Sequence, residues 1–256
     1  CYQADKSFSN KSNGFMGHMS FETFQKCIDE LEGNVEAITF ASRGEPTLNK
    51  DFYKMLSYSE NKFLALKLNT NASMLNEDSI HKLLSSDLQT IVFSIDAKDK
   101  ISYEKIRVNG KFDKVLKNLE LFNKIRNKHY QRSDKVVRIS GVKINNEQNI
   151  LEMKKQWGDI ADIIAFTNYV PWESSYDNPL NDIVSPCSEL WSRLFIWQDG
   201  KVNPCDYDYK SVLSKWNVNN NTITEIWNSN YYDDLRKLHL NKQRYKINPC
   251  NKCINV

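Results

Sequence analysis

The sequence has no apolar run approaching the roughly 18–20 residues that a membrane-spanning helix needs, and its first residues lack the pattern of a signal peptide. It also lacks an excess of charge of one sign, because 35 Lys and Arg stand against 32 Asp and Glu, a net charge of +3 with His neutral. Interspersed charges in this balance provide no basic field of the kind that nucleic-acid-binding proteins carry. Solenoid-type repeats and long low-complexity tracts are absent as well. We therefore expect a soluble cytoplasmic protein with no membrane or nucleic-acid partner.

The chain is nevertheless long and apolar enough to bury a core. It has 256 residues, of which 40% are hydrophobic and 12% aromatic, and this composition excludes wholesale disorder. The length predicts one large domain, or one large domain with a small appendage.

Helical and strand patterns alternate between residues 20 and 170. Strand patterns occur at 35–40, 64–68, 90–95, 136–142 and 163–166, and helical patterns at 20–31, 51–57, 78–84, 112–127 and 149–157. Five strands in a repeated βα order predict an α/β fold with a parallel sheet and outer helices.

Polar residues follow several of these strands. Because parallel folds of this kind place their chemistry at the carboxyl ends of the strands, these residues are candidates for a binding site. Loops also carry polar residues for no functional reason, so none of them is informative alone. The candidates are Gly44, Glu45, Thr70, Asn71, Ser94 and Asp96.

The pattern changes after about residue 170. An Asp199-Gly200 turn between short apolar stretches predicts a β-hairpin over 192–203, and a helix is expected over 222–240. We predict two domains, 1–170 and 171–256. Residues 168–182, with Tyr169, Trp172 and Glu173, either line a substrate pocket or form a linker.

The six cysteines point to metal chemistry more than to disulfides, since the chain is too large and apolar to need covalent staples. A Cys-x-x-Cys pair near the end of the chain aims two thiolates at one centre, and the hairpin can bring two more together. Four thiolates suit zinc or an iron–sulfur cluster, and the spacing does not choose between them. Cys27 is expected to be a buried helix residue, and the metal candidates are Cys187, Cys205, Cys250 and Cys253.

These residues together resemble the radical S-adenosylmethionine (radical SAM) superfamily with a C-terminal SPASM/twitch-type auxiliary-cluster domain. Gly44-Glu45-Pro46 resembles the family's GGEP motif, with Arg43 in place of its first glycine. Thr70-Asn71 and Ser94-Ile95-Asp96 resemble the next strand ends, and Cys1-Tyr2-Gln3 the end of the Cys-x-x-x-Cys-x-x-Cys loop, whose other cysteines would lie upstream. The tail has the family's Cys-x₁₂-Gly-x₄-Cys form at Cys187, Gly200 and Cys205, followed by Cys250-x-x-Cys253.

The resemblance implies a partial (β/α)₆ barrel whose first strand lies outside this chain, and two iron–sulfur clusters. Cys1 would be a ligand of a four-iron (4Fe–4S) cluster that binds S-adenosylmethionine (SAM), and the four tail cysteines would hold an auxiliary 4Fe–4S cluster. Gly44 and Glu45 would meet the SAM amino group, and Ser94 and Arg138 its carboxylate or ribose. Thr70 and Asn71 would lie at the same cofactor site, and Asp96 is a candidate for the ribose or the substrate.

The activity implied is reductive cleavage of SAM to a 5′-deoxyadenosyl radical that abstracts hydrogen from the substrate. We predict a two-electron oxidation of a small molecule such as a sugar or cyclitol, with the auxiliary cluster as electron acceptor and flavodoxin or ferredoxin as electron donor. Two alternatives stay open: a peptide-modifying maturase, and a non-catalytic protein stabilised by a four-cysteine metal site. The residue that would act on the substrate itself is not identified.

Overall fold

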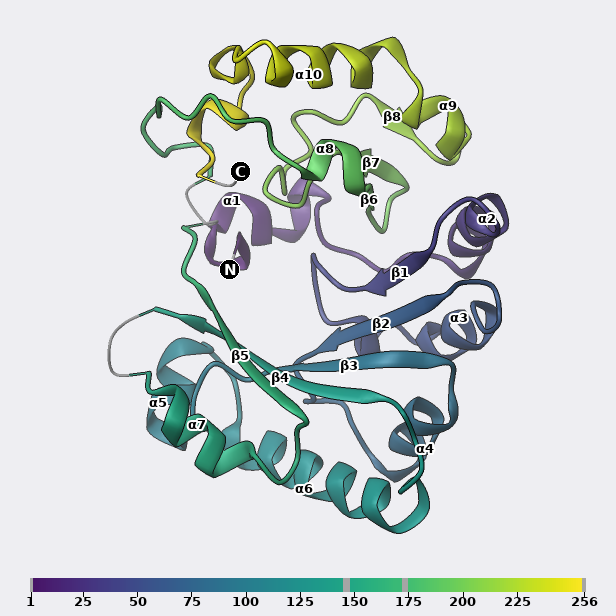
Figure 1. Cartoon of the computed structure of the whole chain (residues 1–256), viewed down its shortest axis with the longest axis vertical. Coiled ribbons are helices and arrows are strands. Elements are labelled where there is room, and N and C mark those ends of the chain that lie inside the picture. Colours follow the sequence, from purple (N-terminus) through teal and green to yellow (C-terminus); the bar gives the residue numbers. More distant parts are fainter. Residues whose placement is uncertain (1, 145–147, 172–174, 255–256) are drawn as a thin grey trace. The chain divides into compact units, whose positions relative to one another are not determined.

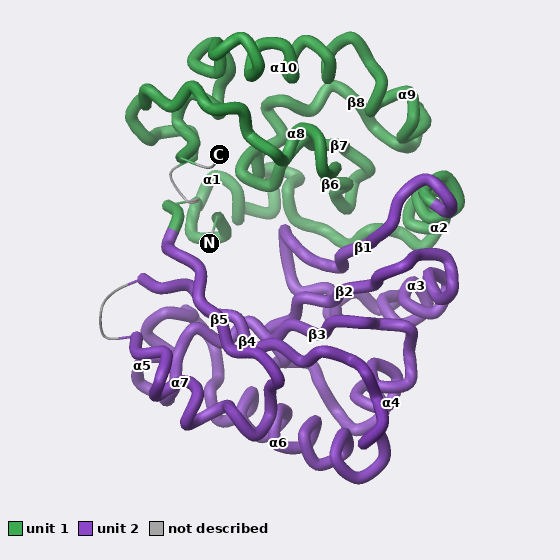
Figure 2. Tube along the Cα trace, viewed as in Figure 1, with its two compact units in different colours: residues 1–31, 170–256 green, residues 32–169 purple. Residues whose placement is uncertain are grey.

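The computed structural model describes residues 2–144, 148–171 and 175–254, and its contacts divide them into two compact units (Figure 2). Unit 2 covers residues 32–169, and unit 1 combines residues 1–31 with 170–256. The division we predicted, 1–170 and 171–256, assigns the first 31 residues differently and stays a prediction.

Unit 2 contains a five-stranded parallel sheet whose strands follow one another in sequence order (Figure 1). This confirms the predicted α/β fold, and the strand ends differ from the expected ones by only a few residues. The strands are β1 (Ala37–Phe40), β2 (Ala65–Thr70), β3 (Leu88–Ser94), β4 (Val136–Lys143) and β5 (Ile163–Asn168).

The helices of unit 2 connect successive strands. Because every crossover runs in the same direction, α4, α6 and α7 gather on one side of the sheet (Figure 1). The helices are α3 (Phe52–Tyr58), α4 (Glu77–Ser85), α5 (Lys100–Ile106), α6 (Phe112–His129) and α7 (Ile150–Trp157), with a 3₁₀ turn, η3 (Pro46–Leu48), before α3. Helix α5 was not predicted; Asp99 caps it by accepting the Ser102 N–H at 2.9 Å.

The two faces of the sheet differ in polarity. Residues in one set of paired rows are buried and apolar, and Phe40 packs on Phe52 of α3 as Phe93 packs on Phe122 of α6. The other set of rows carries half-buried polar side chains, with Asn69 and Arg138 on either side of the buried Val92 and Ser94 paired with Ser140. The polar set of rows, called the inner face below, is the side of the sheet that could bind a polar ligand.

Unit 1 is built around a small antiparallel sheet and short helices. Strands β6 (Phe195–Ile196) and β7 (Lys201–Asn203) form the predicted hairpin, and Gly200 at its turn has φ +80°. A third strand, β8 (Trp216–Asn217), was not predicted. The helices are α1 (Lys6–Ser9), α2 (Phe21–Leu31), α8 (Glu189–Ser192), α9 (Ile223–Trp227) and α10 (Asn230–Leu240), and the 3₁₀ turns are η1 (Tyr2–Ala4), η2 (Lys11–Asn13), η5 (Arg244–Lys246) and η6 (Cys250–Lys252).

The helix expected over 222–240 is two helices. Thr222 and Glu225 form a capping box that begins α9, but Ser229 begins a second helix by accepting the Tyr232 N–H. Because a serine cap competes with helix continuation, the helix is interrupted at 228–229 although apolar residues continue on both sides.

Helix α2 packs within unit 1. Cys27 is buried with Val202, Val218 and Ile226, as predicted for a core helix residue, and the carboxylate of Glu30 accepts the Ile223 N–H that begins α9 at 2.5 Å. Helix α2 therefore shares a core with the C-terminal region.

Candidate functional site

The carboxylate of Glu45 joins the ends of two strands in unit 2. Its Oε1 accepts hydrogen bonds from the Thr70 hydroxyl at 2.6 Å and from the Thr47 hydroxyl at 2.5 Å and N–H at 3.2 Å. Its Oε2 accepts the Asn71 N–H at 2.6 Å. The predicted residues Glu45, Thr70 and Asn71 thus form one hydrogen-bonded group, in which the last residue of β2 and its neighbour hold the carboxylate in place.

The backbone turns sharply after three of the strands. Ser42, Ala72 and Asp96 have φ angles of 88°, 61° and 62°, in the left-handed region that non-glycine residues rarely adopt. Each lies two residues after the end of a strand, β1, β2 or β3 respectively. Strained backbone of this kind costs about 1–3 kcal/mol per residue and concentrates at functional sites.

Asp96 is held by protein groups on both carboxylate oxygens. Oδ1 accepts the Val142 N–H of β4 at 2.8 Å, and Oδ2 pairs with Arg107 Nη2 at 2.7 Å. The side chain is 10% exposed. Asp96 therefore fastens the end of β3 to β4 and to the residue that follows α5, and its contact with ribose or substrate stays a prediction.

Two polar atoms on the inner face of the sheet have no hydrogen-bond partner among the residues that the structure describes. Arg138 Nε and Asn69 Oδ1 are buried and lack hydrogen bonds to the described part of the chain, although the two residues occupy the same row of the sheet. Since buried polar atoms normally find partners, these two suit a polar ligand. Ser94 lies further along the same face, at the last position of β3.

The glycine of the predicted Gly44-Glu45-Pro46 motif borders open space. A Cβ built on Gly44 meets nothing within 4 Å, whereas a Cβ on Gly141 of β4 would approach the Phe166 ring at 2.6 Å and the Asp96 backbone at 3.2 Å. An acceptor at Glu45, an unused donor at Arg138 and free room at Gly44 match the amino and carboxylate groups and the bulk of SAM, so the residues present fit that molecule.

The four tail cysteines of unit 1 are all free thiols. Burial raises the pKa of the Cys250 thiol to about 12, and the charges of Cys253 and Cys187 also raise it. Burial likewise raises the pKa of Cys205, which also responds to the charge of Cys250. These charge effects connect Cys250 with Cys187, Cys205 and Cys253. Four thiols are the donor set of an iron–sulfur cluster, and their assignment as its ligands stays a prediction.

Cys27 stands apart from this group. Burial is again the main cause that raises its pKa to about 12, but the charges acting on it are those of Glu30 and Lys26 on its own helix.

Among the described residues, no three His, Cys, Asp or Glu side chains are placed to share a single metal ion.

Two buried side chains that the sequence analysis did not single out border the cysteines. The Cys187 N–H donates to His239 Nδ1 at 3.2 Å, and burial, followed by the charge of Arg244, lowers the His239 pKa to about 4. Arg244 donates to the carbonyl oxygens of Cys250 at 2.9 Å and Cys253 at 2.7 Å. Their signal in the sequence is weak, because each is a single residue that lies outside the cysteine motif.

Three predicted residues lie outside the described part of the chain: Cys1, Trp172 and Glu173. Tyr169 is described; it is 38% exposed, and its N–H donates to the Lys143 carbonyl at 3.2 Å, which extends the pairing of β5 with β4.

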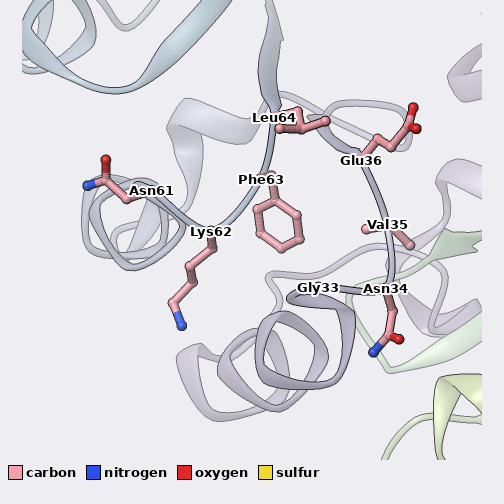
Figure 3. A pocket seen from close by; sticks show the side chains of 8 residues that line it. All are labelled: Gly33, Asn34, Val35, Glu36, Asn61, Lys62, Phe63 and Leu64. Carbon is pink, nitrogen blue, oxygen red and sulfur yellow. The ribbon is translucent and has the colours of Figure 1, made fainter.

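A hollow of about 380 Å³ lies at the amino ends of strands β1 and β2. Figure 3 shows that it is lined by the loops that lead into β1 and β2, with the Glu36 and Lys62 side chains extending from its rim. Parallel α/β folds of this type bind at the carboxyl ends of the strands, so this hollow at the amino ends does not belong to the candidate site.

Two family models match this chain. The radical SAM superfamily model matches residues 1–156, and the SPASM model, described as an iron-sulfur cluster-binding domain, matches residues 187–254. Within the described residues, no helix has the length and apolar character to cross a membrane.

Individual relatives are distant. The mycofactocin maturase MftC of Mycolicibacterium smegmatis is 28% identical over 102 residues, 40% of this chain and 26% of that protein. The chain therefore spans about a quarter of the length of this relative.

Two solved structures share the fold. BtrN in complex with AdoMet and 2-DOIA has a TM-score of 0.60 at 17% identity, covering 94% of this chain and 82% of BtrN. SuiB of Streptococcus suis bound to the precursor peptide SuiA has a TM-score of 0.67 at 16% identity, covering 84% of this chain and 59% of SuiB.

Proposed function

The chain belongs to the radical SAM superfamily, and we propose that it is an enzyme that cleaves SAM reductively and uses the resulting 5′-deoxyadenosyl radical to abstract hydrogen from a small molecule. Its cofactors are SAM, a 4Fe–4S cluster that binds SAM, and an auxiliary 4Fe–4S cluster in the SPASM domain. We propose Cys1 as a ligand of the first cluster and Cys187, Cys205, Cys250 and Cys253 as the ligands of the second.

The residues at the strand ends would bind and orient SAM. Glu45, already held by Thr47, Thr70 and Asn71, would accept the SAM amino group beside Gly44. Arg138 Nε would donate to the SAM carboxylate or ribose, with Ser94 further along the same face. A carboxylate that is fixed before the ligand arrives loses little freedom on binding, which favours a single SAM orientation.

The observation that carries the oxidation proposal is the closed set of four cysteine thiols. With four protein ligands the auxiliary cluster supplies a one-electron acceptor and not a substrate-binding site, so loss of a hydrogen atom, a proton and an electron sums to a two-electron oxidation. The hydrogen atom goes to the 5′-deoxyadenosyl radical and the proton to a base that the proposal does not assign. We propose a flavodoxin or ferredoxin as the electron donor.

A sugar- or cyclitol-like substrate is supported by the fold likeness to BtrN, which extends over 94% of the chain and whose structure contains 2-DOIA. Modification of a peptide is the second candidate, supported by the likeness to SuiB with its precursor peptide and by the partial similarity to a maturase.

The test is anaerobic reconstitution of the full-length protein, followed by measurement of iron and sulfide and then of SAM cleavage. About eight irons per chain indicate two four-iron clusters. Formation of 5′-deoxyadenosine with a substrate product lighter by two hydrogens supports the oxidation. Zinc without iron would overturn the enzyme proposal in favour of a structural four-cysteine site, and a cross-linked or epimerised product would replace oxidation with another radical reaction.

The two substrate classes are separated by isotope transfer. Deuterium that moves from a deuterated sugar or cyclitol into 5′-deoxyadenosine supports the small-molecule proposal. Transfer from a deuterated peptide alone would establish the second candidate.

A further inference from the structure

The Arg244 side chain is 1% exposed and lies beside the cysteine site of unit 1. It belongs to η5, six residues before Cys250, and its guanidinium donates to main-chain oxygens. Nε donates to the Cys250 carbonyl at 2.9 Å and Nη2 to the Cys253 carbonyl at 2.7 Å. One planar group therefore spans both ends of the Cys250-x-x-Cys253 turn.

The same guanidinium reaches the segment of the first tail cysteine. Nη1 donates to the carbonyl of Ser185, two residues before Cys187, at 3.4 Å. The N–H of Cys187 itself is held by His239 Nδ1, and His239 is also 1% exposed. Two segments that lie about sixty residues apart in the sequence are thus joined through one arginine, and this contact places three of the four ligand-bearing residues relative to one another.

Arg244 contributes a positive charge to the cysteine site in addition to its hydrogen bonds. The guanidinium is buried and bonded to the Cys250–Cys253 turn, so its positive charge would lie close to a cluster bound there. A cluster bound by four thiolates is anionic and gains one more negative charge when it is reduced. A buried positive charge beside it favours the reduced form, and net charge and hydrogen bonding are among the factors that set such potentials.

We propose that Arg244 is the positioning residue of the auxiliary cluster, which holds the Cys187 segment against the Cys250–Cys253 turn and raises the reduction potential of the cluster. The proposal goes beyond the proposed reaction and rests on only one part of it, the presence of the auxiliary cluster. It does not depend on SAM cleavage or on the identity of the substrate.

The test compares three variants of the full-length protein, each carrying Cys1→Ala to remove a proposed ligand of the SAM-binding cluster. Arg244→Met removes the charge and the hydrogen bonds but keeps an apolar stem, and Arg244→Lys keeps the charge without the three-pronged geometry. Arg236→Met is the matched control, because Arg236 lies in the same unit and donates instead to the carbonyls of Leu190 and Trp227 at 3.0 Å each. Circular dichroism checks folding, iron analysis gives cluster content, and a redox titration followed by electron paramagnetic resonance gives the potential.

We expect Arg244→Met to bind less iron than the parent and to shift the reduced-to-oxidised ratio at a fixed potential at least tenfold toward the oxidised form, about 59 mV for a one-electron couple. Arg244→Lys should keep that ratio within about threefold of the parent while losing part of its iron on dilution. Arg236→Met should change neither quantity. A merely structural arginine would alter iron content without moving the potential.

An unchanged iron content and potential in Arg244→Met would overturn the proposal, as would equal losses in Arg244→Met and Arg236→Met. If Arg244→Met folds but binds no cluster, Arg244→Lys decides: a parent-like potential supports the proposal, and a tenfold-shifted ratio despite the retained charge refutes the electrostatic part. A parent protein that binds no auxiliary cluster refutes the proposed function first, so the two failures are distinguishable.

Discussion

The strand-end group around Glu45 and the cysteine site around Arg244 both use one charged side chain to hold separate segments together, and the two charges are opposite. Glu45 is an anion that accepts hydrogen bonds from Thr47, Thr70 and Asn71, and it lies in the loop between β1 and η3, where it reaches the end of β2. Arg244 is a cation that donates to carbonyl oxygens of irregular loops. In each site one charged side chain ties together segments distant in the sequence. Only the first, however, lies where the periodicity of the chain predicts it.

The largest contrast should come from the cysteines. Cys250→Ala removes one of four thiolates and should abolish the auxiliary cluster, with a loss of about four irons per chain. Cys27→Ala is the control, because Cys27 is also a free thiol but is buried in the α2 core; this variant should keep its iron and lose about 1–2 kcal/mol of stability. Iron and sulfide analysis with thermal unfolding measures both. Full iron content in Cys250→Ala would remove this residue from the ligand set.

Glu45→Gln should weaken SAM binding about 10–100-fold. The amide nitrogen of Gln cannot accept a hydrogen bond, so Thr70 or Asn71 loses its acceptor. The SAM amino group also loses the negative charge that would bind it. Hydrogen bonds to charged groups contribute about 1.5–3 kcal/mol. Calorimetric or equilibrium-dialysis titration with SAM gives the affinity. The control is Glu36→Gln, which changes an exposed side chain just before β1 and should leave the SAM affinity unchanged. Equal affinities for the parent and Glu45→Gln would place SAM elsewhere.

A pair of glycine substitutions separates packing from binding. Gly141→Ala should destabilise unit 2 by about 1–3 kcal/mol, since the new methyl group would lie within 2.6 Å of the Phe166 ring. Gly44→Ala has no neighbour within 4 Å and should leave stability within about 0.5 kcal/mol while raising the SAM dissociation constant about tenfold. Chemical denaturation and SAM titration measure the two effects. A Gly44→Ala protein with parent-like SAM affinity would show that the space is not used by the ligand.

The smallest expected effect concerns Asp5 in unit 1. Burial acts to raise the pKa of Asp5, but hydrogen bonds from Lys210, Ser7 and Tyr209 outweigh it and hold the pKa below its usual range. The ionised form therefore stabilises the fold at neutral pH, and this stabilisation is lost as the pH falls below the ordinary value of 3.8. Asp5→Asn should cost about 1–2 kcal/mol at pH 7 and progressively less below pH 4, by denaturant unfolding at each pH. A cost independent of pH would assign the effect to packing.

Much of unit 2 follows from local sequence. Alternating apolar segments predicted all five strands, and the strand ends then placed Glu45, Thr70 and Asn71 at one edge, because parallel strands end on the same side. Helix α5 was missed although Asp99 and Ser102 form a recognisable cap at its start. The half-buried inner face could not be read from burial patterns alone, because its polar residues, such as Asn69, look like those of an ordinary amphipathic strand.

Less of the cysteine site was predictable. Spacing predicted the four cysteines as a metal-binding set, which stays a prediction, but it did not predict the residues that hold their main chain. Arg244 and His239 act through main-chain groups of residues far away in sequence, and a side chain that bonds a carbonyl leaves no trace in the identity of its partner. The cap at Ser229 was missed for a related reason, since the apolar pattern continues across it and only the competition between the serine hydroxyl and the helix reveals the break.

The packing of α2 against α9 has a consequence for biosynthesis. Glu30 and its partner Ile223 are 193 residues apart, and at ribosomal rates of about 5–20 residues per second α2 emerges roughly 10–40 s before its packing partners exist. During this interval the apolar side of α2, with Phe24, Cys27 and Ile28, has no native core to enter. Translation speed and chaperone access, more than the final stability of the fold, would then govern how much of the nascent chain reaches the native state.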